Sequence, residues 1–132
     1  MSYKTIKYEV RDEIAIVTFN RPEQRNAFDL TMREELADIV AEIRNDLSLK
    51  AAIITGAGGA FCAGGDVKAM NNRTARAPEG HKDMQKSHDR VYNLLNMPLP
   101  VISLIDGPAA GAGANLALAA DFVLMTPKSF IM

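Results

Sequence analysis

The stretch ITGAGGAFCAGGDVK, residues 54–68, decides the fold, because a short apolar strand runs there into glycine-rich turns. A second glycine-rich stretch, DGPAAGAG at residues 106–113, also follows an apolar strand. Glycine allows a positive φ and lets a ligand approach the backbone closely. In open α/β sheets, ligands bind beyond the carboxyl ends of the strands, where both turns are expected. The two stretches therefore predict an α/β fold with a ligand site at one edge of the sheet.

Around these turns, the hydrophobic pattern alternates between strand-like and helix-like segments. Apolar runs typical of strands and apolar stripes typical of helices follow one another in the order ββαβαβαβ. This order predicts a sheet with right-handed crossover connections. The predicted strands are 6–10, 14–19, 51–55, 101–105 and 122–125, and the predicted helices are 31–47, 83–96 and 109–120.

Local signals set the expected boundaries. Thr31 with Glu34 fits a capping box at the start of the first helix. Residues 71–82 are polar and hold a proline and a glycine, so we expect a mobile segment over the ligand pocket. The sequence stops at an apolar run, 128–132, with no closing element after it, which suggests a fragment or a chain whose remainder lies elsewhere. The first helix is expected to bury one stripe, which consists of Met32, Leu36, Ile39, Val40, Ile43 and Leu47.

The composition is that of an ordinary globular domain. The chain has 132 residues, 48% hydrophobic and 23% charged, which is enough for one domain over 1–132 with its own core. Fifteen basic against 16 acidic residues give a net charge of −1, which argues against nucleic-acid binding by bulk charge. No apolar run reaches the length of a signal peptide or membrane span. We therefore expect a cytoplasmic protein with neither a nucleic-acid nor a membrane partner.

The glycine turns match neither of the common phosphate-binding motifs. G-x-G-x-x-G is absent, and no lysine follows a G-x-x-x-x-G spacing, so dinucleotide and P-loop sites are excluded. Two interpretations remain. Either the turns only allow tight helix packing, or they direct two backbone N–H groups at one oxygen atom of a ligand.

Three segments together resemble the crotonase, or enoyl-CoA hydratase/isomerase, superfamily. They are RPEQRNA at 21–27, ITGAGGAFCAGGDVK at 54–68 and DGPAAGAGANLA at 106–117. They occur in the family's order over essentially the whole chain, and they look most like isomerases of the phenylacetate-pathway type. Because family members are longer, the resemblance implies that 1–132 is the N-terminal part of a crotonase-like ββα-spiral core.

The resemblance also implies a site. Family members bind acyl-CoA thioesters and stabilise an enolate between two backbone N–H groups, which match Gly65 and Ala112 here. The expected helix start near Ala112 agrees, since free N–H groups and the positive end of a helix dipole favour an anion. CoA would arrive with the substrate, so no separate cofactor is implied, and a homotrimer or homohexamer is expected. On the CoA side, the matching positions are Arg25, Ala27, Ala63, Asp66 and Lys68.

Several of these positions have a plain structural alternative. Arg25 and Lys68 also fit solvated surface charges. Asp66 follows a turn, so it is expected to cap the next helix rather than to act as a base. Cys62, the single cysteine, is expected to be a small packed residue. The two histidines are expected on a solvated helix face, and no metal site is predicted.

One position departs from the family pattern. Hydratases of the family carry a glutamate where this chain has Asn115, and an amide cannot transfer a proton. Hydration by two carboxylates is therefore not expected, whereas isomerisation needs a single base, which we expect beyond Met132. The sequence thus favours an enoyl-CoA isomerase over a hydratase-like enzyme. The alternative is a non-catalytic acyl-CoA-binding or assembly protein of the same fold.

Overall fold

The computed structural model of the chain describes residues 2–66 and 77–132, whose main element is a five-stranded sheet. The strand order is β1-β2-β3-β4-β6. The first pair is an antiparallel hairpin, and every later pair is parallel. This is the α/β topology that the sequence predicts. The strands are β1 (Ile6–Arg11), β2 (Ile14–Phe19), β3 (Ala51–Gly56), β4 (Val101–Ile105) and β6 (Phe122–Met125).

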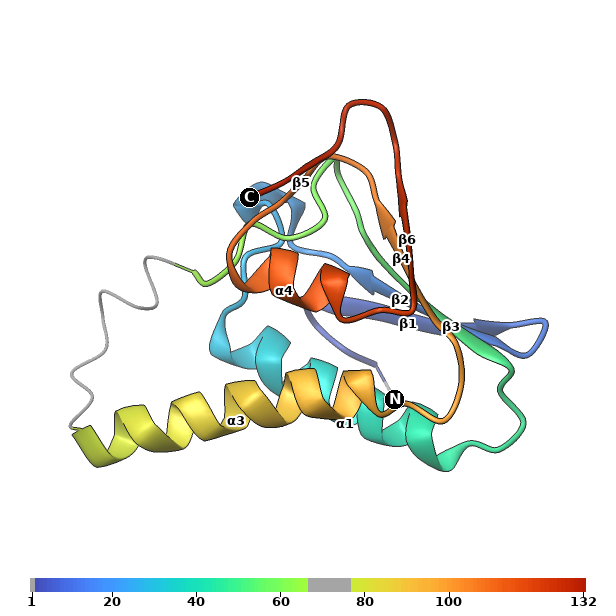
Figure 1. Cartoon of the computed structure of the whole chain (residues 1–132), viewed down its shortest axis with the longest axis horizontal. Coiled ribbons are helices and arrows are strands. Elements are labelled where there is room, and N and C mark those ends of the chain that lie inside the picture. The colour runs from blue at the N-terminus through green and yellow to red at the C-terminus, as the bar shows by residue number, and fades with distance from the viewer. Residues whose placement is uncertain (1, 67–76) are drawn as a thin grey trace.

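Helices cover one face of the sheet (Figure 1). Alternate residues of β2, β3 and β4 are buried in a core shared with these helices, as the strand period of two requires. In the described ranges, no helix is both long and apolar enough to cross a membrane. The helical elements are η1 (Pro22–Gln24, a 3-10 turn), α1 (Leu30–Asn45), α3 (Ala77–Leu95) and α4 (Ala112–Leu118).

A second, smaller layer lies beyond the carboxyl ends of β3 and β4. β5 (Pro108–Ala109) pairs in parallel with β7 (Phe130–Ile131). On its other side, Ala109 forms a parallel bridge with Cys62. The apolar run that ends the sequence thus forms a strand, β7, which the sequence pattern did not predict.

The first helix begins and ends earlier than predicted. Its N-cap is Asp29, whose carboxylate accepts a hydrogen bond from the N–H of Met32 at 2.8 Å, so the Thr31 capping box does not form. The helix ends at Asn45, and Leu47 is 94% exposed instead of buried. The rest of the predicted stripe is confirmed, and Leu49 enters the core in place of Leu47.

The other two helices also differ from the prediction at their starts. α3 begins at Ala77, so the second half of the segment predicted to be mobile is helical, and its first half, 71–76, lies outside the described residues. The proline of this segment is the second residue of α3, where the missing N–H is tolerated. α4 begins at Ala112 instead of Ala109, because Ala109 belongs to β5.

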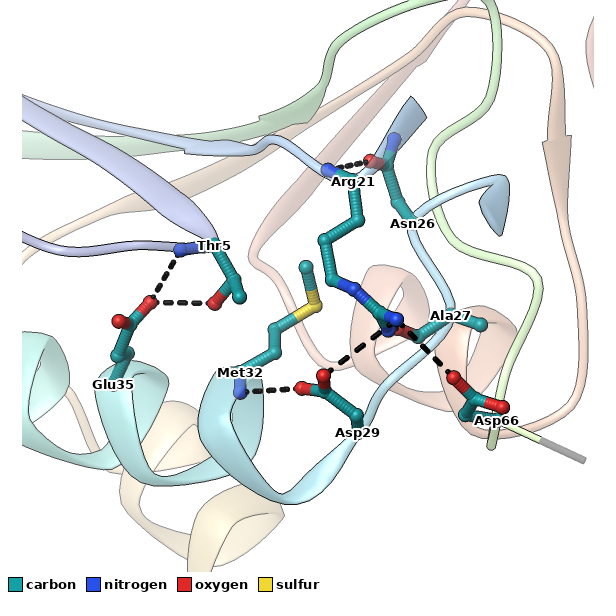
Figure 2. A network of polar contacts seen from close by, with 8 residues as sticks. All are labelled: Thr5, Arg21, Asn26, Ala27, Asp29, Met32, Glu35 and Asp66. Carbon is teal, nitrogen blue, oxygen red and sulfur yellow. Dashed lines mark hydrogen bonds and ion pairs between the residues drawn. The ribbon is translucent and has the colours of Figure 1, made fainter. Parts of the chain in front are cut away.

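Glu35 of α1 fastens the N-terminal segment to the core (Figure 2). Its carboxylate accepts hydrogen bonds from the N–H of Lys4 at 2.7 Å, from the N–H of Thr5 at 2.9 Å and from the Thr5 hydroxyl. Partial burial opposes the charged form, but these hydrogen bonds outweigh it and lower the pKa of the Glu35 carboxyl.

We expect Glu35→Gln to reduce the free energy of unfolding at pH 7 by about 1 kcal/mol, a low value because the carboxylate is only partly buried. Because the pKa of Glu35 is lower in the folded than in the unfolded chain, its carboxylate stabilises the fold fully above the unfolded-state pKa of about 4.3. This stabilisation is lost as the pH falls through the folded-state pKa. Urea unfolding at a series of pH values should therefore show the two chains converging below about pH 4. Glu34→Gln, on the exposed side of the same helix, is the control and should match the unmodified chain. A constant difference at every pH would contradict this account.

Candidate functional site

The candidate site is built around residues 61–66, which run between two other backbone segments. On one side they pair with the loop after η1. The N–H of Phe28 donates to the Gly64 carbonyl at 2.7 Å, and the N–H of Asp66 donates to the Phe28 carbonyl at 2.9 Å. The N–H of Ala63 donates to the carbonyl of Arg25 at 3.0 Å. Two of the predicted CoA-side residues, Arg25 and Ala63, are therefore in direct backbone contact.

On the other side, the same residues pair with the second glycine-rich stretch. The N–H of Phe61 donates to the Pro108 carbonyl at 3.0 Å, and the N–H of Ala110 donates to the Cys62 carbonyl at 2.9 Å. Glycine makes this approach possible. A Cβ on Gly113 would lie 2.4 Å from the Cys62 carbonyl oxygen, which is closer than real Cβ atoms come. The two glycine-rich stretches are thus fixed against each other.

The N–H of Gly65 points away from the first partner segment. A trans peptide directs its C=O and N–H in opposite directions, and Gly64 and Gly65 share one peptide unit. Because the Gly64 carbonyl faces Phe28, the Gly65 N–H faces the side of the second glycine-rich stretch. Within residues 2–66 and 77–132, this N–H donates to no protein acceptor.

The N–H of Ala112 is left open by the turn that starts α4. Gly111 has φ 55° and ψ −124°, and the N–H of Gly113 donates to the Ala110 carbonyl at 2.9 Å, which together define a type II′ turn. The Gly111 carbonyl accepts from the N–H of Asn115 inside the helix, so the Ala112 N–H points out of the helix start. It has no acceptor in the described part of the chain.

The two N–H groups lie on touching segments. A Cβ built on Gly64, the residue before Gly65, would be 3.5 Å from the nitrogen of Ala112. Ala112 is exposed and Gly65 is half-buried. The predicted pair is therefore brought together at one surface of the molecule.

The remaining CoA-side positions are placed as follows. Arg25 is exposed, with its backbone in the left-handed region at φ 51°, and Ala63 is exposed beside it. Ala27 is buried behind them, 8% exposed. Lys68 lies outside the described residues.

Asp66 is held by a residue that the sequence analysis missed, Arg21. One guanidinium nitrogen of Arg21 lies 3.2 Å from the Asp66 carboxylate and 3.5 Å from that of Asp29, and the other donates to the Ala27 carbonyl at 2.6 Å (Figure 2). The structure thus places Asp66 in an ion pair with Arg21, and that it does not act as a base stays a prediction. The helix that it was expected to cap lies outside the described residues.

Asn26 is a second residue that the sequence analysis missed. It is fully buried with φ 59°, and its side chain forms hydrogen bonds with three backbone groups. Its oxygen accepts from the N–H of Arg21 at 2.8 Å, and its NH₂ group donates to the carbonyls of Ala57 at 2.9 Å and Ala60 at 2.8 Å. The sequence signal that could have indicated this role is an asparagine shortly after a proline turn, because Asn adopts the left-handed region more readily than other side chains.

Two further predicted residues are clearly placed. Asn115 is exposed in the first turn of α4, one helical turn from Ala112. Cys62 is fully buried, and this burial raises the pKa of its thiol to about 11, so it is the packed residue expected. Among the described side chains, no cluster has the composition of a metal site.

A cavity of about 360 Å³ opens between α1 and α3. Leu116, four residues after Ala112 on the same side of α4, forms part of its wall. Other apolar lining residues include Leu36, Val40, Ile54 and Leu94, and charged residues at the cavity include Arg33, Lys86, Asp89 and Arg90.

Residues 9–132 match the model of the enoyl-CoA hydratase/isomerase family. The chain belongs to this family. It is 38% identical over its whole length to a probable enoyl-CoA hydratase of Rhodobacter capsulatus, of which it spans 50%. It is 39% identical over 93% of its length to 1,2-epoxyphenylacetyl-CoA isomerase of Escherichia coli, of which it spans 48%.

Solved structures confirm the crotonase fold. An enoyl-CoA hydratase/isomerase from Xanthobacter autotrophicus Py2 superposes on 98% of the chain with a TM-score of 0.93 and 35% identity, and the match covers 49% of that structure. The chain therefore spans about half the length of the crotonase relatives it matches.

We expect Gly113→Ala to destabilise the fold by about 1–3 kcal/mol, because the new methyl group meets the Cys62 carbonyl oxygen. Inside a helix, this substitution otherwise stabilises by about 1 kcal/mol. Thermal or urea unfolding measures the difference. Gly59→Ala is the comparison. A Cβ there meets nothing within 4 Å, so the cost of this variant reports only the strain of a side chain at φ +86°. A stabilised Gly113→Ala chain would show that the two stretches are not in tight contact.

Proposed function

We propose that this crotonase chain binds an acyl-CoA thioester with the carbonyl oxygen between the N–H groups of Gly65 and Ala112. One observation carries the proposal. Both N–H groups lie on adjoining segments, and neither has an acceptor within the described residues. Backbone donors left open at a tight turn and at a helix start are suited to an oxygen that gains negative charge.

The chemistry that follows is enolate stabilisation. When a base removes a proton next to the thioester carbonyl, negative charge moves onto the carbonyl oxygen. Two fixed N–H donors stabilise that charge without reorganising during the reaction, and each such donor typically contributes about 10²–10³ in rate. Returning the proton to a different carbon moves the double bond.

The nearby residues supply the rest of the proposed site. Arg25 and Ala63 form an exposed rim suited to the CoA moiety, with the Ala63 carbonyl available to the adenine. The family resemblance assigns Lys68 to CoA as well. The apolar wall of the cavity reaches α4 one turn below Ala112, which favours that side for the acyl chain. The homo-oligomer expected from the family stays a prediction.

Of the two reactions in the family's name, we infer isomerisation. Asn115 cannot donate or accept a proton in catalysis, and the carboxylate of Asp66 is paired with Arg21. A single base from outside this set is sufficient for double-bond migration. Hydration needs a second proton-transferring group, which neither residue supplies.

Gly65→Pro removes one proposed donor, and we expect kcat/KM for a short enoyl-CoA to fall by about 10²–10³ in the intact protein. Gly65→Ala is the matched control, because it changes the side chain but keeps the N–H, and it should remain within about tenfold of the unmodified enzyme. Far-ultraviolet circular dichroism checks that both variants fold. Equal activities of the folded proline and alanine variants would rule out the Gly65 donor.

Asn115→Glu separates the two reactions. An added, positioned acid–base group is worth about 10²–10⁴ where the rest of the machinery exists. If the protein is an isomerase, hydration should stay weak, and double-bond migration should be level or reduced by the added charge. Asn115 is exposed, so the new carboxylate should ionise as a surface glutamate does. Both reactions are to be followed on one enoyl-CoA preparation, with Asn115→Gln as the control.

A large gain of hydration with no loss of migration would reverse the assignment. Tight binding of acyl-CoA with neither reaction, in the unmodified protein and in both Asn115 variants, would favour the non-catalytic binding protein instead.

A further inference from the structure

We propose that Arg21 is a positioning residue that fixes the direction of the Gly65 N–H by holding Asp66 against the loop at Ala27. The inference rests on the proposed function, because it concerns the donor assigned there. It adds a residue that touches neither the thioester nor the reacting atoms.

Three polar groups from two parts of the chain, the loop 27–29 and Asp66, meet at the Arg21 guanidinium (Figure 2). They are the carbonyl of Ala27, the carboxylate of Asp66 directly after the Gly65 turn, and the carboxylate of Asp29 at the start of α1. The Arg21 side chain is only 16% exposed and that of Asp66 only 11%, so water screens their attraction weakly. These contacts surround the Phe28–Gly65 backbone pair.

Backbone hydrogen bonds with Phe28 hold the Gly65 peptide, but no polar side chain of its own segment does. Residues 63–65 are alanine and two glycines, which have no side chain able to form a polar tether. Gly64 has φ +99°, so the backbone before Gly65 is in a region that side chains rarely adopt. Asp66 is the first residue after the turn whose side chain binds another segment. Arg21 therefore acts on Gly65 through Asp66, in addition to the two hydrogen bonds with Phe28.

An arginine is suited to this task. Its planar guanidinium offers several N–H donors in fixed directions, so it serves a carbonyl and two carboxylates at once. A lysine at the same position would keep the charge but lack the fixed fork. We therefore expect Arg21→Lys to keep the fold but to position the Gly65 N–H less well than arginine does.

The test uses the intact protein and butyryl-CoA carrying an isotopic label in its thioester carbonyl. Hydrogen bonds from the two N–H groups lower the stretching frequency of this carbonyl, which infrared difference spectroscopy measures in the bound ligand. The variants are Arg21→Met, Arg21→Lys and, as a matched control, Arg11→Met. Arg11 is exposed, and among the described residues its side chain pairs with Glu9 of the same hairpin alone.

We expect the unmodified protein and Arg11→Met to lower the frequency equally, Arg21→Met to lose at least about half of the lowering, and Arg21→Lys to lie between them. Turnover of a short enoyl-CoA should show kcat reduced about 10–100-fold in Arg21→Met with KM within about threefold, because a misplaced donor weakens the transition state more than substrate binding. A purely structural role would reduce the amount of folded protein and leave the carbonyl frequency of the folded fraction unchanged.

The outcomes separate this inference from the function on which it rests. If the unmodified protein binds butyryl-CoA without lowering the frequency, the oxyanion assignment and the role of Arg21 both fail. If the unmodified protein lowers it and folded Arg21→Met lowers it equally, only the role of Arg21 fails. Should Arg21→Met not fold, Arg21→Lys decides, and a full lowering in that variant overturns the proposal.

Discussion

The structure depends on the contact between two backbone segments, 59–64 and 107–113, that no side chain separates. A Cβ at Gly107 would lie 2.0 Å from the carbonyl oxygen of Gly59, and one at Gly113 would lie 2.4 Å from that of Cys62. Glycine at these positions lets the loop after β3 and the loop after β4 pair directly. The donors at Gly65 and Ala112 are close to each other because these loops are. On the far side, Asn26 binds the carbonyls of Ala57 and Ala60, and Arg21 binds Asp66 directly after the loop, so the loop is held along both edges.

The strands and their order could be predicted because they follow from local pattern. β2, β3 and β4 each bury every second side chain. Strands of this kind are recognised from the apolar and β-branched residues of the sequence alone. Helix ends were predicted less well because tertiary contacts decide them. Asp29 caps α1 although Thr31 offers an equally good local signal, since Asp29 also faces Arg21. The type II′ turn at Gly111 likewise makes α4 begin later than predicted. The alanine-rich sequence around it gives no sign of this turn.

The site could be predicted only in part, because its proposed donors are backbone atoms. A glycine-rich stretch shows where the backbone is accessible, but the direction of a single N–H depends on which donor binds the carbonyl of the same peptide unit. For Gly65 that partner is Phe28, which lies 37 positions away in the sequence numbering and gives no local signal. Arg21 and Asn26 were missed for the same reason. Their partners, such as Asp66 and Ala60, come from a distant turn, and a charged or amide residue in a polar loop normally indicates a solvated surface.

Exposure determines how strongly the proposed donors can act. Hydrogen bonds to a developing negative charge are strong where water is excluded and weak where water competes. Ala112 and Asn115 are both exposed in this structure. The surface that excludes water from the thioester oxygen must therefore come from the bound acyl-CoA or from polypeptide outside residues 2–66 and 77–132. The described residues orient the donors, and the strength of those donors depends on what covers them.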